Sequence, residues 1–183
     1  RDTTFKVSVV YDDPPEITVR LIIIGDLLHE GTDEVHTLKN GGLKKWLDED
    51  ITINMNMSVK DLILAGLDRL EVEYKGAFYP QYDSYYFKGI QIPRSGDYLE
   101  EFSNGALSGW MYHVNGYYPD RGVDRYYPDD GDIVVFHYTD DYTMEESIGS
   151  DGAGYGVDLE FYPPKDEPEN PEEEARKQLE QAS

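Results

Sequence analysis

Apolar residues occur along most of the chain in short alternating or continuous runs, which is the pattern typical of β-strands. Residues 133–138 are apolar on both faces and are expected to form a central strand. Residues 25–50 are mostly polar and irregular, and residues 44–47 among them are expected to form one short helical turn. The predicted strands cover residues 5–11, 17–24, 51–55, 85–92, 110–114, 133–138 and 157–161.

One internal segment has helical spacing instead. Ser58 precedes it and Asp61 follows three residues later, a variant of the capping box that begins many helices. The apolar residues that recur along one face are Val59, Leu62, Ile63, Leu67 and Leu70. One helix among many strands predicts an α+β fold: a β-grasp-like sheet packed on one main helix, with extra N-terminal and C-terminal strands.

The segment 109–116, Gly-Trp-Met-Tyr-His-Val-Asn-Gly, reads as a strand that ends in a tight turn. Asn115 and Gly116 both tolerate the positive φ that such a turn requires. Alternation along the strand puts Trp110, Tyr112 and Val114 on one face. Farther along, residues 130–132 turn the chain into the predicted central strand.

These segments, in this order, resemble the transcobalamin-like C-terminal domain family. The resemblance rests on the helix start at 58–62 (SVKDL), on segment 109–116, on Pro119 and Gly122, and on DGDIVVFHYT at 130–139. It covers about residues 17–139, and departs from the family pattern in the insertion at 25–50 and the tyrosine-rich segment 78–87. The resemblance implies a β-grasp-type module, found at the end of vitamin B12 carriers and in many bacterial surface proteins.

In the animal B12 carriers this module covers one face of the corrin, while a helical barrel supplies the rest of the site. The positions that match imply a ligand-contact set of Trp110, Tyr112, His113, Asn115 and Tyr117. Cobalamin is therefore one cofactor to consider. The competing interpretation is that Trp110 and Val114 are ordinary core residues.

Composition narrows the surroundings in which the chain works. Its net charge of −22 would repel nucleic acid phosphates and anionic lipid headgroups, so neither nucleic acid binding nor membrane insertion is expected. No cysteine is present, as is common in surface proteins of Gram-positive bacteria. Because the sequence begins at Arg1, we expect a piece of a larger extracellular protein, either secreted or at the cell surface, with neighbouring domains.

Acidic residues give a second candidate site. From residue 127 to residue 163 there are ten acids and no Lys or Arg. Calcium prefers several oxygens close together, so the candidate ligands are Asp129, Asp130, Asp132, Asp140 and Asp141. Solvated acidic loops are the competing interpretation. The four histidines are scattered, although His113 and His137 lie in strands that are expected to be neighbours, where a two-histidine metal site is conceivable.

Four segments follow from these patterns: an N-terminal strand or remnant of a preceding domain (1–16), the grasp-like domain (17–142), an additional strand with a glycine-rich hinge (143–162), and an acidic Pro-rich linker with a short helix (163–183). None of the common catalytic motifs occurs, and no enzymatic activity is expected. The sequence favours a non-catalytic binding or spacer module, as in adhesion proteins. The alternative is a domain that covers one face of a corrinoid.

Overall fold

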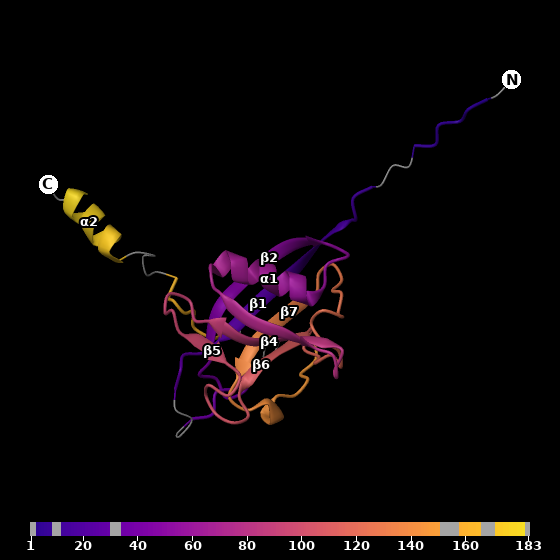
Figure 1. Cartoon of the computed structure of the whole chain (residues 1–183). Coiled ribbons are helices and arrows are strands. Elements are labelled where there is room, and N and C mark those ends of the chain that lie inside the picture. The colour runs from indigo at the N-terminus through magenta and orange to yellow at the C-terminus, as the bar shows by residue number, and fades with distance from the viewer. Residues whose placement is uncertain (1–2, 9–11, 30–33, 151–157, 166–170, 182–183) are drawn as a thin grey trace.

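The computed structural model describes residues 3–8, 12–29, 34–150, 158–165 and 171–181, which form two β-sheets and two α-helices (Figure 1). The larger sheet has the order β2–β1–β7–β6, with bounds Lys44–Asn54, Glu16–Gly25, Ile133–Thr139 and Gly109–Val114. The smaller sheet has the order β3–β4–β5, with bounds Tyr74–Tyr79, Ser84–Gln91 and Tyr98–Glu100. The helices are α1 (Val59–Leu70), the 3₁₀ helix η1 (Tyr142–Met144) and α2 (Pro171–Gln181). The predicted α+β class is confirmed.

The larger sheet is mixed, and its strand order is compatible with the β-grasp-like arrangement expected from the sequence. Strand β1 pairs antiparallel with β2 and parallel with β7, so that Ile22 lies beside Val135 at the centre of the sheet. Strand β6 completes the sheet by pairing antiparallel with β7. Because β1 and β7 are parallel neighbours, the residues that follow them, Asp26 and Asp140, emerge at the same edge of the sheet.

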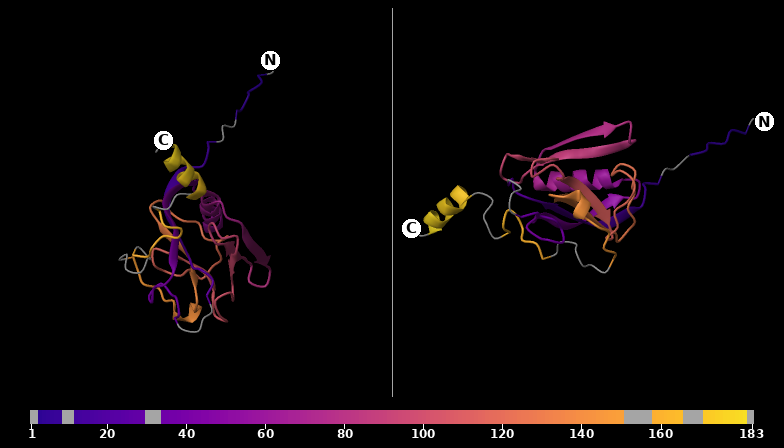
Figure 2. Two further views of the ribbon diagram at one scale, coloured as in Figure 1. Left: turned by 90° about the vertical axis from the view of Figure 1, so that its left-hand side faces the viewer. Right: turned by 90° about the horizontal axis from the view of Figure 1, so that it is seen from below.

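Strand β1 is central because its side chains are apolar on both faces. Leu21 and Ile23 face α1 and belong to the main core, together with Leu62 and Leu67 of the helix. Ile22 and Ile24 face the other way and pack with Leu43 and Val135. Figure 2 shows α1 lying against the larger sheet, with the smaller sheet beside it. None of the helices in the described residues is long and apolar enough to cross a membrane.

Helix α1 begins where the capping signal predicts. The Ser58 side chain accepts a hydrogen bond from the Asp61 backbone N–H, and the Asp61 carboxylate accepts one from the Ser58 N–H at 3.0 Å. The next two N–H groups, of Val59 and Lys60, donate to the carbonyls of Tyr126 and Val123, both at 2.8 Å. The free donors of the first turn therefore hold the chain around residues 123–126 against the helix.

The prediction of a short helical turn at residues 44–47 is wrong, because these residues form the first part of β2. Strand β1 offers an open row of backbone donors and acceptors, and pairing with Lys44 and Lys45 satisfies them. The Trp46 ring lies directly over Gly25, where any side chain would collide with it. Tertiary pairing overrides the local helical preference at this position.

The extra terminal strands are not observed where they were predicted, insofar as the structure describes them. Residues 3–8 form no strand, none of the described strands pairs with them, and Phe5 and Val7 are 84% exposed. Within 158–161, pairing is limited to one parallel bridge from Phe161 to Lys45. Residues 9–11, Val157 and the glycine-rich segment 152–156 lie outside the described residues.

Candidate functional site

A cleft of about 590 Å³ lies between strand β4 and strand β6. Its walls come from β4 and the turn before it, from β6, and from residues 118–125. Among the lining residues are Tyr85, Trp110, Tyr112, Tyr118, Arg121 and Arg125. This volume falls in the range of about 300–1,000 Å³ that is usual for small-molecule sites. The cleft is therefore large enough to hold a ligand or the side chains of a partner.

Local structure keeps the third wall in place. The backbone of Gly122 lies so close to Ser84 that a Cβ at Gly122 would overlap the serine hydroxyl. The Asp124 carboxylate accepts a hydrogen bond from the Tyr85 N–H at 3.1 Å. Together with the contacts to the first turn of α1, these interactions tie residues 122–126 to β4 and to the helix.

Tyrosines dominate the polar chemistry of the cleft. The hydroxyl of Tyr112 donates to the carbonyl of Arg121, and that of Tyr118 lies 2.7 Å from His137 Nε2. Burial raises the pKa of Tyr85, Tyr86, Tyr112 and Tyr118 above the ordinary value for tyrosine. At neutral pH these hydroxyls are neutral hydrogen-bonding groups on apolar rings, so they suit contact with a ligand and not proton abstraction.

Two arginines stand out beside the tyrosines because the chain as a whole is so acidic. Arg125 forms an ion pair with Asp83 at the rim of the cleft. The Arg121 guanidinium lies 6.0 Å from the centre of the Tyr126 ring. The Lys60 ammonium from α1 lies 4.0 Å from the centre of the Tyr85 ring, within cation–π distance. Because Asp83 and Asp120 also line the cleft, its two arginines balance its two acidic residues, in contrast to the strongly acidic chain as a whole.

The cleft brings together two of the five predicted ligand residues, Trp110 and Tyr112. Trp110 is only 6% exposed, and its indole N–H donates to the Leu99 carbonyl at 2.9 Å. Its ring stacks on Phe136, with 4.7 Å between centroids. Trp110 therefore belongs to the core and also forms part of the floor of the cleft. Tyr112, on the same face of β6, is more accessible.

The other three predicted ligand residues are placed elsewhere. His113 points to the opposite face of β6 and is fully buried. The Asn115 side chain donates to Asp132 Oδ1 and accepts from the Ile133 N–H, both at 2.9 Å, so it fixes the turn against the start of β7. Tyr117 is 57% exposed and does not line the cleft. The sequence motif thus combines contact positions with residues that hold the strand in place.

The acids predicted to bind calcium separate into two groups. At the start of β7, Asp130 Oδ1 accepts from the Thr18 N–H and Asp132 Oδ2 accepts from the Asp129 N–H, both at 2.8 Å. Asp141 caps η1 by accepting from the Thr143 N–H at 2.9 Å. All of these carboxylates act as acceptors for nearby backbone groups.

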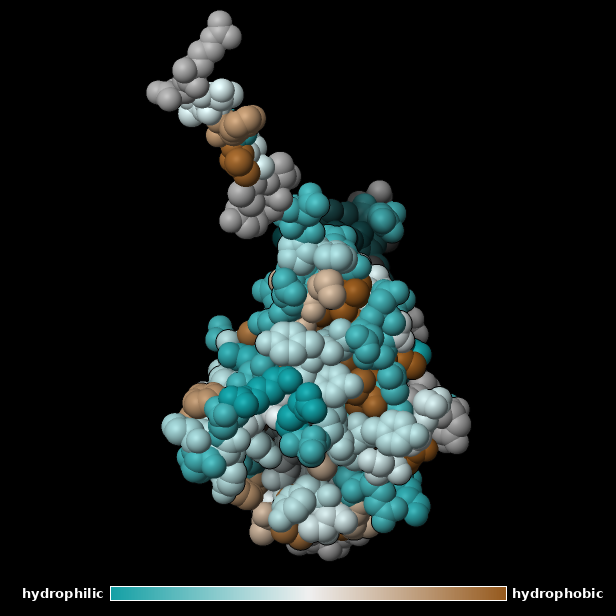
Figure 3. Space-filling view, turned by 90° about the vertical axis from the view of Figure 1, so that its right-hand side faces the viewer, coloured by the Kyte–Doolittle hydropathy of each residue, from teal (hydrophilic) through white to brown (hydrophobic). Residues whose placement is uncertain are grey.

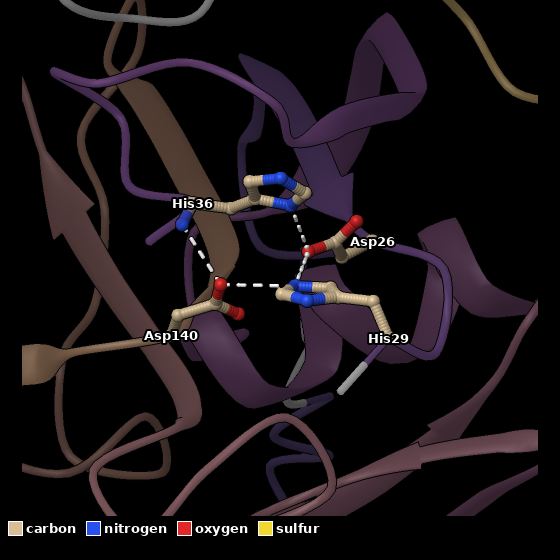
Figure 4. A group of neighbouring side chains, drawn as sticks. All are labelled: Asp26, His29, His36 and Asp140. Carbon is tan, nitrogen blue, oxygen red and sulfur yellow. Dashed lines mark hydrogen bonds and ion pairs between the residues drawn. The ribbon is translucent and has the colours of Figure 1, made fainter. Parts of the chain in front are cut away.

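Asp140 is buried and is surrounded by residues that the sequence interpretation did not select. Asp26, His29, His36 and Asp140 each offer one ligand atom, and the four atoms lie within 4.8 Å of one another. We call this group the His–Asp cluster (Figure 4). Burial raises the pKa of Asp26, while its contact with His36 acts in the opposite direction. Within the described part of the chain, no other group of three or more His, Cys, Asp or Glu side chains converges in this way.

A signal for the cluster is present in the sequence. Asp26 directly follows the predicted strand 17–24, and His29 and His36 come next in a segment that has no regular pattern. Asp140 follows the predicted strand 133–138. If these two strands are taken as parallel neighbours, both aspartates fall at one edge of the sheet beside the two histidines. The sequence patterns did not reveal that β1 and β7 pair in parallel, and without this pairing the cluster could not be predicted.

The pair His113 and His137, for which a metal site was conceivable, is packed differently. The rings lie 5.9 Å apart between centroids. Both nitrogens of His137 lie at hydrogen-bonding distance from protein atoms, Nδ1 from the Tyr138 carbonyl and Nε2 from the Tyr118 hydroxyl. Burial lowers the pKa of His113 to about 3 and also lowers that of His137. The two histidines are neutral core residues.

Fold and cleft together define a β-grasp-like α+β module with an aromatic-lined cleft on one side of its sheets. Residues 77–140 match the model of a protein family described as a domain of unknown function, DUF4430. The match covers about a third of the chain and includes every lining residue of the cleft, but only Asp140 of the His–Asp cluster. No curated protein matches the chain.

Proposed function

We propose that this chain is a non-catalytic binding module of a secreted or cell-surface bacterial protein, and that it holds its partner in the cleft. The observation that carries the proposal is the lining: apolar tyrosine rings whose hydroxyls remain neutral, with two arginines beside them. Such a surface favours a flat ligand with polar edges, since rings stack on its faces and hydroxyls bond its rim.

The same lining argues for binding over catalysis. A general base or nucleophile needs a pKa near the working pH or an adjacent activating group. Burial raises the pKa of the tyrosines in the cleft, further from neutral pH. The Asp83 carboxylate forms an ion pair with Arg125. Asp120 extends into solvent, with its side chain 98% exposed. These residues are suited to recognition.

The surface and the composition of the chain support its proposed place in a secreted or cell-surface protein. Figure 3 shows hydrophobic residues in small separate patches on the face that it presents, without one broad apolar area. A net charge of −22 keeps such a protein soluble and disfavours nucleic acid and anionic membranes as partners. The resemblance to the transcobalamin-like C-terminal domain family is compatible with the family match at residues 77–140, and supports an extracellular module next to other domains.

The cleft can be tested with indole as a small planar probe. The Trp110 indole N–H signal in an NMR titration reports on the floor of the cleft, because Trp110 is one of its lining residues. We expect saturable shifts at Trp110 and at cleft backbone signals. Tyr112→Ala should weaken them, whereas the matched change Tyr117→Ala, outside the cleft, should not. If both variants respond like the wild type, the cleft is not the binding surface and the spacer interpretation is favoured.

A corrinoid is the alternative ligand, favoured because the cleft contains Trp110 and Tyr112 of the segment on which the resemblance rests. The open cleft would cover one face of such a ring, so binding by this chain alone should be weak, since half a site leaves the cost of ordering the ligand uncompensated. Calorimetric titration with cyanocobalamin measures this. Submicromolar affinity that is lost in Tyr112→Ala would identify a complete corrinoid site. Titration heats that equal those of diluting the ligand into buffer would exclude the corrinoid alternative.

A further inference from the structure

The His–Asp cluster lies at the edge of the larger sheet where the parallel strands β1 and β7 both end. Asp26 follows β1 directly and Asp140 follows β7 directly. His29 and His36 come from the connection between β1 and β2, and their rings lie 4.3 Å apart between centroids. Figure 4 shows all four side chains pointing toward one another. Two separate segments of the chain thus supply one convergent group.

We propose that Asp26, His29, His36 and Asp140 bind one divalent transition-metal ion, with Zn²⁺ as the best match to these donors. Asp26 Oδ2 lies 2.8 Å from His36 Nδ1 and 3.2 Å from His29 Nε2, and Asp140 Oδ2 lies 2.9 Å from the same His29 nitrogen. Tetrahedral zinc with bonds of about 2.0–2.1 Å separates its ligand atoms by roughly 3.3 Å. These three separations are close to that spacing, and all four donor atoms lie within 4.8 Å of one another.

His36 is hydrogen-bonded within the cluster, through its ring to Asp26 and through its N–H to Asp140, both at 2.8 Å, but the contacts of His29 are poor as ordinary hydrogen bonds. His29 Nε2 is near two carboxylate oxygens, yet it is buried and makes no hydrogen bond of acceptable geometry with any described residue. Asp140 Oδ1 is likewise buried without a described partner, and the Asp140 side chain is only 4% exposed. Buried polar atoms in proteins nearly always have a partner. A metal ion at the centre of the cluster would supply one.

The charge of the cluster also favours a bound cation. The Asp26 and Asp140 side chains are 3% and 4% exposed. Among the described residues, their ion-pair partners are the two histidines and no Lys or Arg. Two carboxylates that are removed from water beside each other are costly unless positive charge compensates them. A divalent cation provides that charge.

Neighbouring groups orient the ligands in the way that metal sites require. Asp26 Oδ1 accepts from the Leu27 N–H at 2.7 Å, which leaves Oδ2 to face the imidazoles. The buried Asn104 accepts from the His29 N–H at 3.2 Å and donates to the Leu27 carbonyl at 3.1 Å. Gly42 has φ of 89° and its backbone lies against the His36 ring, where any side chain would collide. A cavity of about 290 Å³ lies beside His36.

The donor set selects the class of metal. Calcium and magnesium take oxygen ligands, so two imidazole nitrogens disfavour them. Two nitrogens and two carboxylate oxygens suit zinc and its first-row neighbours. Four protein ligands are typical of a structural zinc site, which has no open position for substrate. The ion would therefore pin the connection between β1 and β2 to the end of β7.

The test uses the whole chain without a histidine tag, after dialysis against EDTA. Calorimetry with ZnCl₂ should show one saturable site per chain. Zinc at a hundred times its dissociation constant should raise the melting temperature by roughly 5–10 °C, and equal calcium or magnesium should not. Cobalt(II) should give the visible absorption of a tetrahedral site. Equal shifts with all divalent ions, or more than one zinc per chain, would reduce the effect to surface binding and overturn the proposal.

Two ligand variants and one control complete the design. Asp140→Asn and His29→Gln should lose the zinc shift and the cobalt absorption, whereas Asp120→Asn, which removes a fully accessible carboxylate, should keep both. Asp140 Oδ2 accepts from the His36 N–H at 2.8 Å, and the amide oxygen of Asp140→Asn can still do so while the variant removes one buried charge. The metal-free Asp140→Asn protein should therefore melt no lower than the metal-free wild type. If it melts lower and zinc stabilises neither protein, the cluster is a hydrogen-bonded network and the proposal is wrong.

Discussion

The molecule contains two pairs of neighbouring histidines, and their surroundings differ completely. His29 and His36 lie on the connection that follows β1, are partly exposed, and face the carboxylates of Asp26 and Asp140. His113 and His137 are fully buried on adjacent strands β6 and β7, beside the ring of Tyr118. The first pair could act as metal ligands, and the second pair is packed as neutral core.

The difference teaches that position in the sheet, and not residue type, decides what a histidine does. Strand β6 pairs with β7 so that Met111 lies opposite His137 and His113 opposite Val135, which encloses both rings among the side chains around these two strands. The parallel β1–β7 pair brings two aspartates to one sheet edge, next to a connection that carries the other two histidines. Neither setting is visible in the local sequence.

The largest effect is expected from breaking the turn that keeps β6 and its histidine in register with β7. Asn115 and Gly116 have φ of 50° and 83°, as the tight-turn prediction requires. A side chain at Gly116 would also collide with the carbonyl of Gly149. Gly116→Val should therefore cost about 2–5 kcal/mol, from strain and overpacking together. Urea unfolding followed by tryptophan fluorescence measures the loss.

Gly41 provides the matched control for that turn. Its φ is also positive, at 81°, but nothing lies within 4 Å of where its Cβ would be. Gly41→Val thus carries the backbone strain without the collision and should cost less than Gly116→Val. If Gly116→Val unfolds at the wild-type urea midpoint, the turn does not hold β6.

The second largest effect is a loss of unfolding free energy in acid, and it comes from His113 of the buried pair His113 and His137. Burial holds the pKa of His113 at about 3, well below the 6.5 of an unfolded chain. The unfolded chain therefore binds a proton below pH 6.5 that the folded protein excludes. The stabilisation is complete above pH 6.5 and is lost as the pH falls toward 3. One such group costs about 1.4 kcal/mol per pH unit, or about 3 kcal/mol between pH 6.5 and 4.5.

The measurement compares unfolding free energies of the wild type and His113→Phe across that range. The variant keeps a ring in the core but cannot take up the proton, so its free energy should fall less steeply with acid. The carboxylates of this acidic chain contribute equally to both proteins and cancel in the difference. Parallel curves would mean that His113 is not held neutral, and the contrast between the two histidine pairs would weaken.

Much of the fold could be predicted from periodicity. The alternating or continuous apolar runs in 17–24, 85–92, 110–114 and 133–138 gave four strands that are observed, and the Ser58–Asp61 pair marked the start of α1. Strand β5 was missed because three residues are too short to show a period, and β3 because its side chains are largely exposed. Residues 44–47 became strand only through pairing with β1, which no local signal reveals.

Sites were harder to predict, because they depend on which segments meet. Trp110 and Tyr112 were selected from a local motif, and the structure places both at the cleft. Arg121 and Arg125 were not predicted as site residues. They lie in a loop between strands, where no periodic pattern indicates which way a side chain points. Asp140 was chosen for its acidity alone, whereas its partners Asp26, His29 and His36 lie more than a hundred residues away. Long-range parallel pairing brings them together.

A smaller loss of stability is expected from the acids of the turn before β7, and it should be independent of the His–Asp cluster. Asp132 accepts from the Asp129 N–H and from the Asn115 amide at 2.8 and 2.9 Å, so its carboxylate holds two turns together. Asp132→Ala should cost about 1–2 kcal/mol, the net value of such bonds. Asp120→Ala, at a fully accessible carboxylate, should cost almost nothing. Urea midpoints measure both, and zinc should stabilise Asp132→Ala as much as wild type.

The smallest expected effect is that of calcium, and it completes the contrast between the two groups of acids. Asp130 and Asp132 in the turn before β7, and Asp141 at the start of η1, already accept hydrogen bonds from backbone or side-chain donors. The cluster presents imidazoles that calcium does not favour. Millimolar calcium should therefore raise the melting temperature no more than magnesium at equal ionic strength, since both only screen the charge of the chain. Differential scanning calorimetry of the EDTA-treated protein measures the two shifts. A calcium shift well above that of magnesium would place a specific oxygen site in these loops. If Asp130→Asn then abolished the calcium shift and left the zinc response intact, the turn before β7 would be a second, independent metal site.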